Sequence, residues 1–315
     1  MKNLIIDGSE EFLKNLIRLK PNHLNAHCSL AAIYAQTGDY PNAIASYKEV
    51  IRLKPGLADA HCELGRLYAL TNDYQAALAC FKEASRIRPD NAEVQYGLAI
   101  VYEELGDFEK AIESYKEAIR VKSDMAISHY SLGVAYWHIG DQQKVMACFK
   151  EAIRLKPDYA LAHQALGMAY EKTGEHQKAI EHLTESVRLD PKNDETHCCL
   201  GRIYGEAGEY QKAMECFTKA IRLKPTNAEA HNNLGFMYGK IGDQPNAIEC
   251  YNEAIYIDPE MAIAHYNLGV AYEAIGQPQK AIECYKEALR IQPDYPEASA
   301  GLGRLSGKIK NSGDA

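Results

Sequence analysis

Seven of the eleven histidines recur at multiples of 34 residues, a spacing that could build a ladder of metal ligands. They are His27, His61, His129, His163, His197, His231 and His265. Gln95 fills the remaining step of the series. Equivalent residues of stacked helices lie roughly 8–10 Å apart, whereas the ligands of one metal ion all lie about 2 Å from it. The sequence therefore predicts no metal site, and we interpret the histidines as packing residues.

The cysteines are the second candidate for chemistry. Five of the nine fall on one series of the same step: Cys80, Cys148, Cys216, Cys250 and Cys284. A disulfide needs Cα atoms within about 7 Å, and the chain has no C-x-x-C pair. We interpret these cysteines as small apolar residues of a reducing compartment. No nucleophile elbow, phosphate loop or metalloprotease helix is present, so we expect no catalytic residues, no enzyme activity and no cofactor.

The step of 34 residues extends along the whole chain. Its clearest markers are eight prolines and one serine: Pro21, Pro55, Pro89, Ser123, Pro157, Pro191, Pro225, Pro259 and Pro293. A fixed period of this length predicts stacked supersecondary units. Counted from Leu24, full repeats begin at 24, 58, 92, 126, 160, 194, 228 and 262, and the last ends at Tyr295. Below, a place is a position counted from the start of its repeat.

Each repeat predicts two helices. The seventh place is always Leu and the eleventh always Tyr, so both lie on one face of a first helix. Glycine holds the eighth place in six repeats, which predicts close approach of a partner helix. A glycine turn follows. The second helix carries a small residue at the twentieth place and usually a ring at the twenty-fourth, and the proline ends it. Asn91 and Asn227 are suited to cap the next helix.

The Leu-Gly-x-x-Tyr string, the small residue, the ring and the proline resemble the tetratricopeptide repeat family over residues 24–295. The resemblance implies an all-α fold, a right-handed superhelical solenoid of eight helix-turn-helix repeats. Residues 1–23 would form an N-terminal half-repeat with Phe12, Leu13, Leu16 and Ile17 at helical spacing. Residues 296–310 would form a capping helix with Ala298, Leu302, Leu305 and Ile309 turned inward. Residues 311–315 would be frayed.

Charge and hydropathy limit the classes of partner and the location that we expect for the chain. The chain has 35 Lys+Arg against 43 Asp+Glu, a net charge of −8 with both signs interspersed. A nucleic-acid partner is not expected, because phosphate binding needs clustered positive charge. No apolar run approaches the roughly 18 residues of a spanning helix, and the first residues do not form a signal peptide. We expect a cytoplasmic protein without membrane insertion.

In the tetratricopeptide family the second, fifth, sixth, ninth, twelfth and thirteenth places face a concave groove. These places give an aromatic and apolar band of Tyr96, Ile100, Tyr130, Val134, Trp137 and Met168, and a set of Arg66, Arg202, Asn232, Asn233, Tyr266 and Asn267. Rigid aromatic residues make good binding anchors. Glu93, Glu103 and Glu104 flank the band, and the two arginines are expected to be isolated positive charges. The resemblance thus implies a non-enzymatic adaptor that binds an apolar to mildly basic peptide segment of a partner protein.

Two other peptide-binding modes known in this family fit the sequence less well, and two other functions remain as alternatives. The carboxylate clamp needs Lys at the fifth place and Asn at the ninth, and neither requirement is met. The asparagine ladder of O-linked N-acetylglucosamine transferases appears only at Asn233 and Asn267. Two alternative functions remain. The chain could be a homo-oligomeric scaffold that docks through its N-terminal half-repeat, or the substrate-recruiting arm of a separate glycosyltransferase.

Overall fold

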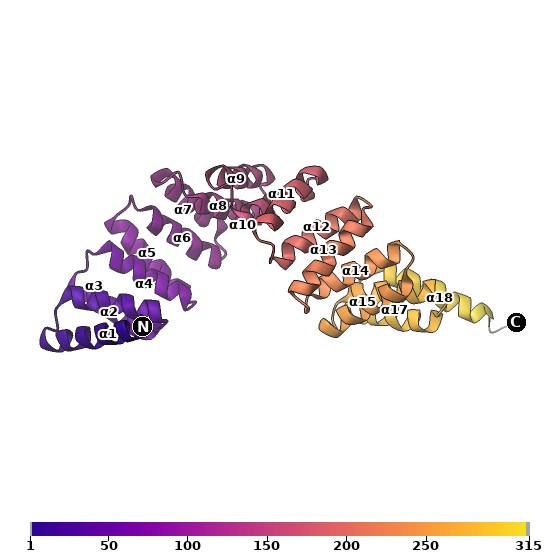
Figure 1. Ribbon diagram of the computed structural model, residues 1–315, viewed down its shortest axis with the longest axis horizontal. Coiled ribbons are helices and arrows are strands. Elements are labelled where there is room, and N and C mark those ends of the chain that lie inside the picture. Colours follow the sequence, from indigo (N-terminus) through magenta and orange to yellow (C-terminus); the bar gives the residue numbers. More distant parts are fainter. Residues whose placement is uncertain (1, 313–315) are drawn as a thin grey trace. The chain divides into compact units, whose positions relative to one another are not determined.

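The computed structural model describes the backbone of residues 2–312 and the side chains of residues 8–307. Residues 2–312 form 18 helices joined by short turns, so the predicted all-α class is confirmed (Figure 1). None of these helices is both long enough and apolar enough to cross a membrane. The helices belong to two compact units, which divide after Pro157.

The first unit contains α1 to α9. Helix α1 packs against α2, and the following helices pair as α2 with α3, α4 with α5, α6 with α7 and α8 with α9. Their bounds are α1 Lys2–Leu19, α2 Leu24–Thr37, α3 Tyr40–Leu53, α4 Ala58–Leu70, α5 Tyr74–Ile87, α6 Ala92–Glu104, α7 Phe108–Val121, α8 Ala126–His138 and α9 Gln142–Leu155.

The second unit repeats the arrangement with α10 to α18. Here α10 pairs with α11, α12 with α13, α14 with α15 and α16 with α17, and α18 packs on α17. Their bounds are α10 Ala160–Lys172, α11 His176–Leu189, α12 Asp194–Glu206, α13 Tyr210–Leu223, α14 Ala228–Lys240, α15 Gln244–Ile257, α16 Ala262–Ala274, α17 Pro278–Ile291 and α18 Pro296–Ser312.

The turns inside the repeats explain why the first helices stop where they do. Gly38 adopts the left-handed conformation with φ 80°, and Asn72 takes the same role with φ 61°. Asparagine tolerates this region better than other side chains do. The next residue often caps the second helix: the side chains of Asp39 and Asp73 each accept a hydrogen bond from a backbone N–H three residues on. Asn91 caps α6 in the same manner, as predicted.

The eighth-place glycines are explained by one contact. A Cβ built on Gly133 would lie 2.6 Å from the ring of Phe149, and one on Gly269 would lie 2.6 Å from the ring of Tyr285. The twenty-fourth-place side chain of the second helix therefore packs directly on the backbone of the first. Phe81 is held on both sides, because a Cβ on Gly97 of the next repeat would also meet its ring, at 2.5 Å.

The two ends differ in how well they are covered. On α1, Leu13 and Ile17 pack against the first core cluster, but Phe12 and Leu19 are 66% and 81% exposed. On α18, Ala298 and Leu305 are buried. The Ile309 side chain lies outside the described residues. Helix α18 continues to residue 312, two residues beyond the predicted end of the capping helix, and residues 313–315 lie outside the described residues.

Candidate functional site

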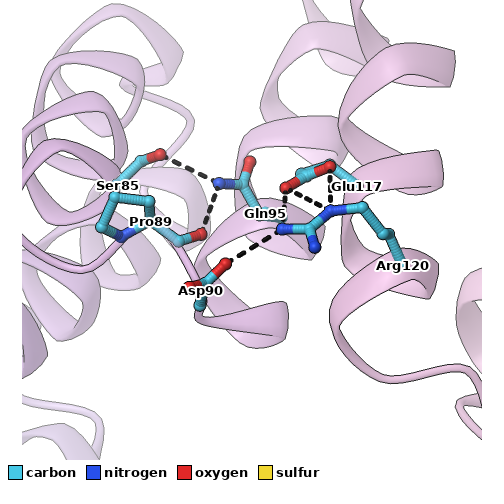
Figure 2. A network of polar contacts seen from close by, with 6 residues as sticks. All are labelled: Ser85, Pro89, Asp90, Gln95, Glu117 and Arg120. Atoms are coloured by element: carbon cyan, nitrogen blue, oxygen red, sulfur yellow. Dashed lines mark hydrogen bonds and ion pairs between the residues drawn. The ribbon is translucent and has the colours of Figure 1, made fainter.

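The histidine ladder is a set of hydrogen bonds between neighbouring helices. In six repeats the ring Nε2–H at the fourth place donates to the carbonyl of the residue six positions earlier, which is the 34-residue marker. The pairs are His27–Pro21, His61–Pro55, His129–Ser123, His197–Pro191, His231–Pro225 and His265–Pro259, at 2.8–3.2 Å. Gln95 replaces this donor through Nε2, 3.2 Å from the Pro89 carbonyl (Figure 2). The histidines thus bond the inter-repeat turn rather than only filling space.

Neither metal ligation nor thiol chemistry has a built site in the described part of the chain. His, Cys, Asp and Glu side chains there do not gather in threes around a point that could hold an ion. All nine cysteines are free thiols. Burial raises the pKa of Cys80 to about 11 and that of Cys148 to about 11. These thiols therefore stay protonated at neutral pH, which is unfavourable for nucleophilic chemistry.

The first unit has a cavity of about 530 Å³ along the first helices α4 and α6. Its apolar lining includes Leu70, Phe81, Tyr96 and Ile100, and Gly97 also lines it. Three of the predicted groove residues, Arg66, Tyr96 and Ile100, therefore meet around one hollow. Its size is within the range of ligand-binding clefts.

Charges at the rim of this cavity are mostly negative. Glu93 and Glu104 line it, and both are exposed. Arg66 also lines it, but its Nη1 lies 3.1 Å from the Glu63 carboxylate, one helical turn earlier. Arg66 was expected to be an isolated positive charge, and that expectation is wrong, because the i, i+3 spacing lets Glu63 reach it.

Tyr96 is held more firmly than a free groove anchor would be. Its hydroxyl lies 3.2 Å from the Ser131 hydroxyl, and its ring centroid lies 5.6 Å from that of Tyr115. Burial raises its pKa. The other predicted residues of the first unit, Tyr130, Val134 and Trp137, are half-buried on α8 and do not line this cavity.

The second unit has a smaller hollow of about 220 Å³ along α14 and α16. Tyr266 and Asn267 line it, as do Phe236 and Val270. Asn267 Nδ2 donates to Asn232 Oδ1 at 3.0 Å. Three predicted residues thus form a chain of amides, because Asn232 Nδ2 in turn donates to Asn233 Oδ1 at 3.2 Å. Asn232 itself is only 4% exposed.

The remaining two predicted residues of the second unit lie on other helices. Met168 is half-buried on α10. Arg202 is not isolated, contrary to expectation: its Nε lies 2.7 Å from the Glu171 carboxylate and its Nη1 lies 3.7 Å from that of Glu229. The ninth place of one repeat faces the twelfth place of the preceding repeat, which explains the pairing with Glu171.

With this geometry known, comparison with protein families identifies the chain. The model of the cilia and flagella-associated protein 70 C-terminal domain matches residues 23–234, more than half of the sequence. Tetratricopeptide repeat models match residues 262–295 and 237–276. The chain is a tetratricopeptide repeat protein. Within that class it belongs to the family of the cilia and flagella-associated protein 70 C-terminal domain. No curated protein sequence matches it.

Solved tetratricopeptide structures support the same fold. The Cut9–Hcn1 hetero-tetramer of the APC/C matches 94% of this chain and 58% of its own at 19% identity, with a TM-score of 0.62. Pseudomonas aeruginosa PilF matches 66% and 94% at 19% identity, with a TM-score of 0.60. YrrB, described as having an unusual peptide-binding site, matches 60% and 97% at 23% identity, with a TM-score of 0.52.

The tetratricopeptide pattern could have identified more of the lining residues than the sequence analysis named. Phe236 and Val270 occupy the ninth place, and Ala69 and Leu70 occupy the twelfth and thirteenth, all of them groove places of the family. The predicted band is confined to the third, fourth and fifth repeats, whereas these four residues lie in the second, seventh and eighth. Met125 carries no such signal, because the thirty-fourth place of the third repeat, which it occupies, is not a groove place of the family.

Proposed function

We propose that the chain is a non-enzymatic adaptor that binds a peptide segment of a partner protein along the first helices of its repeats. The observation that carries this proposal is the apolar cavity of about 530 Å³ between α4 and α6. Proteins of this repeat class typically serve as interaction scaffolds, and the similar protein YrrB has an unusual peptide-binding site.

The charge of the rim supports an apolar segment with a nearby basic residue. Glu93 and Glu104 are exposed at the cavity, while the charge of Arg66 is offset by Glu63. A lysine or arginine of the partner would pair with a carboxylate beside the cavity, and electrostatic complementarity of this kind mainly sets specificity.

We propose a cytoplasmic location for the protein. The family name also suggests an association with cilia or flagella, which the identity of a captured partner would test.

The test is affinity capture with the full chain and two variants. Ile100→Lys puts a charge into the cavity, whereas Leu19→Lys makes the same kind of change on exposed α1 and is the matched control. Circular dichroism checks that both remain helical. We expect wild type and Leu19→Lys to retain a partner that Ile100→Lys loses. Equal capture by all three proteins would contradict the groove assignment.

A second candidate function is self-assembly through the N-terminal half-repeat. It is favoured by the exposure of Phe12 and Leu19 on α1, which leaves apolar surface without a covering helix in the described structure. An unlike pair of surfaces that dock in this way forms rings or open chains. Sedimentation at increasing concentration distinguishes this candidate, because Leu19→Lys would then abolish a rise in particle mass that Ile100→Lys leaves intact.

A further inference from the structure

The second helices of most repeats carry the same exposed ion pair. Glutamate at the twenty-sixth place bonds arginine at the twenty-ninth, at N···O distances of 2.6–2.7 Å. The pairs are Glu49–Arg52, Glu83–Arg86, Glu117–Arg120, Glu151–Arg154, Glu185–Arg188 and Glu287–Arg290. Figure 2 shows one of these pairs, in which Arg120 also bonds Asp90 of the preceding turn at 2.9 Å. The arginine charge is thereby neutralised within the chain.

The sixth repeat reverses this arrangement. Lys219 stands in the place of the glutamate, before Arg222 on α13, and Lys192 stands in the place that Asp90 holds in Figure 2. All three side chains are exposed, and none has an ion-pair partner among the described residues. Burial lowers the pKa of His197, and the nearby charge of Lys219 adds to that lowering. Like charges three residues apart on a helix repel each other, so this cluster is mildly unfavourable in the free chain.

The next repeat, the seventh, leaves a tyrosine uncovered beside this cluster. In other repeats the eleventh-place ring lies under lysines, as Tyr102 lies 5.8 Å from Lys82 Nζ and 5.6 Å from Lys110 Nζ. For Tyr238 the corresponding residues are Thr218 and Asn246, so no lysine of the described chain covers its ring.

A shallow hollow of about 470 Å³ lies at this site. Met214, Tyr238 and Ile241 give it apolar surface, and Lys219 and Arg222 form part of its edge. It therefore combines an unfilled apolar surface with two unpaired cations.

The neighbouring repeat extends the surface. Tyr256 on α15 takes the twenty-ninth place, where most repeats have arginine, and it is 82% exposed. Arginine and tyrosine are enriched at the energetic centres of interfaces. Two carboxylates could in principle offset these charges: Glu215, which lines the hollow, and Glu253 on α15. Neither forms an ion pair with Lys192, Lys219 or Arg222 in the described chain.

We propose that the outer side of α13, with Tyr238 and Ile241 of the next repeat, is a second docking surface that binds an acidic peptide segment carrying one large apolar side chain. The apolar side chain fills the hollow over Tyr238, and aspartate or glutamate side chains neutralise Lys219, Arg222 and Lys192. This surface combines the second helix α13 with the C-terminal end of the first helix α14 and uses none of the residues assigned to the groove, so it stands independently of the proposed function.

Charge favours an acidic protein segment over nucleic acid. A phosphate backbone is bound by an extended track of cations, whereas here the cluster is three cations at the junction of the fifth and sixth repeats, in a chain with net charge −8. An acidic peptide needs only a few carboxylates at this spacing, and the apolar hollow gives it an anchor that a phosphate backbone would leave unused.

The test uses the full chain and a short labelled peptide of aspartate and glutamate with one central phenylalanine, followed by fluorescence anisotropy at low ionic strength. Lys219→Glu restores the ion pair of the other repeats, so it preserves the fold. Lys286→Glu makes the same charge change at an exposed place of α17 and is the matched control. We expect saturable binding that weakens with added salt, falls about tenfold or more in Lys219→Glu and is unchanged in Lys286→Glu.

Further probes separate the outcomes. A peptide with alanine in place of phenylalanine should bind more weakly, and Ile100→Lys should bind the acidic peptide like wild type even if the groove proposal fails. Absence of saturable binding, or equal loss in Lys219→Glu and Lys286→Glu, would overturn the proposal. A single-stranded oligonucleotide that binds more tightly and is released by Lys219→Glu would replace the peptide with nucleic acid. Self-association of the protein alone that Lys219→Glu abolishes would replace it with a second copy.

Discussion

The tightest contact at the residue scale joins a glycine to one side chain of the second helix. Helix α18 offers a matched pair for measuring it. A Cβ on Gly301 would lie 2.8 Å from the ring of Tyr285, whereas a Cβ on Gly303 would meet nothing within 4 Å. We expect Gly301→Ala to lower the free energy of unfolding by about 1–3 kcal/mol, because the ring must shift. Gly303→Ala should raise it by up to about 1 kcal/mol through better helix propensity. Denaturant unfolding of both variants measures the difference, and equal effects would contradict the packing argument.

A second residue-scale prediction concerns pH. Burial lowers the pKa of His197 in the folded chain, so between the folded and unfolded pKa values the unfolded chain binds more protons. Stability should therefore fall as pH drops below about 6.5, the ordinary pKa of histidine. His197→Gln keeps a donor for the Pro191 carbonyl, as Gln95 does for Pro89, and removes the titration. Melting temperatures at neutral and acidic pH should differ less in the variant; an undiminished difference would assign the pH dependence to other groups.

At the scale of the helix, the second helices differ in how they begin. Asp39, Asp73, Asp107, Asp141 and Asp243 each accept a cap bond from a backbone N–H three residues on. Glu209 precedes α13 without a cap bond from its side chain, although it pairs with Lys212. Glu209→Asp shortens the side chain to the length that caps in the other repeats, while an aspartate can still pair with the lysine, as Asp141 pairs with Lys144. We expect Glu209→Asp to raise the free energy of unfolding by about 0.5–1 kcal/mol. The reverse change, Asp141→Glu, should lower the free energy of unfolding by a similar amount. Thermal unfolding of both variants measures these two effects.

The same scale shows what the sequence could and could not predict. The period places the helices, the turn glycines and the asparagine caps, because each depends on residues within one repeat. The pairing of Arg202 with Glu171 and the hydroxyl contact between Tyr96 and Ser131 join residues 31 and 35 positions apart. Such contacts depend on the rise and rotation from one repeat to the next, which the pattern of a single repeat does not contain. For this reason Arg202 was wrongly expected to be isolated.

At the scale of the whole molecule, each helix pair packs mainly on its sequence neighbours within its unit, as expected of a repeat array. Stability is then a sum of local terms, and the end of an array depends on its cap. Helix α18 supplies that cap in the second unit: Leu305 is buried on the last core cluster, and Arg304 lies 2.7 Å from Glu273 of α16.

Removing residues 296–315 should therefore loosen the second unit from one side. Tyr285 would lose the cover that Gly301 and Leu305 give it, and its exposed ring would no longer stabilise α16 and α17. We expect amide hydrogen exchange to speed up in α16 and α17 and to stay slow in α12 and α13, because local opening in a repeat array spreads only through neighbouring contacts. A shorter truncation of residues 308–315 keeps Leu305 and is the control. Uniformly faster exchange from α10 to α17 would instead show that the second unit unfolds as one cooperative body.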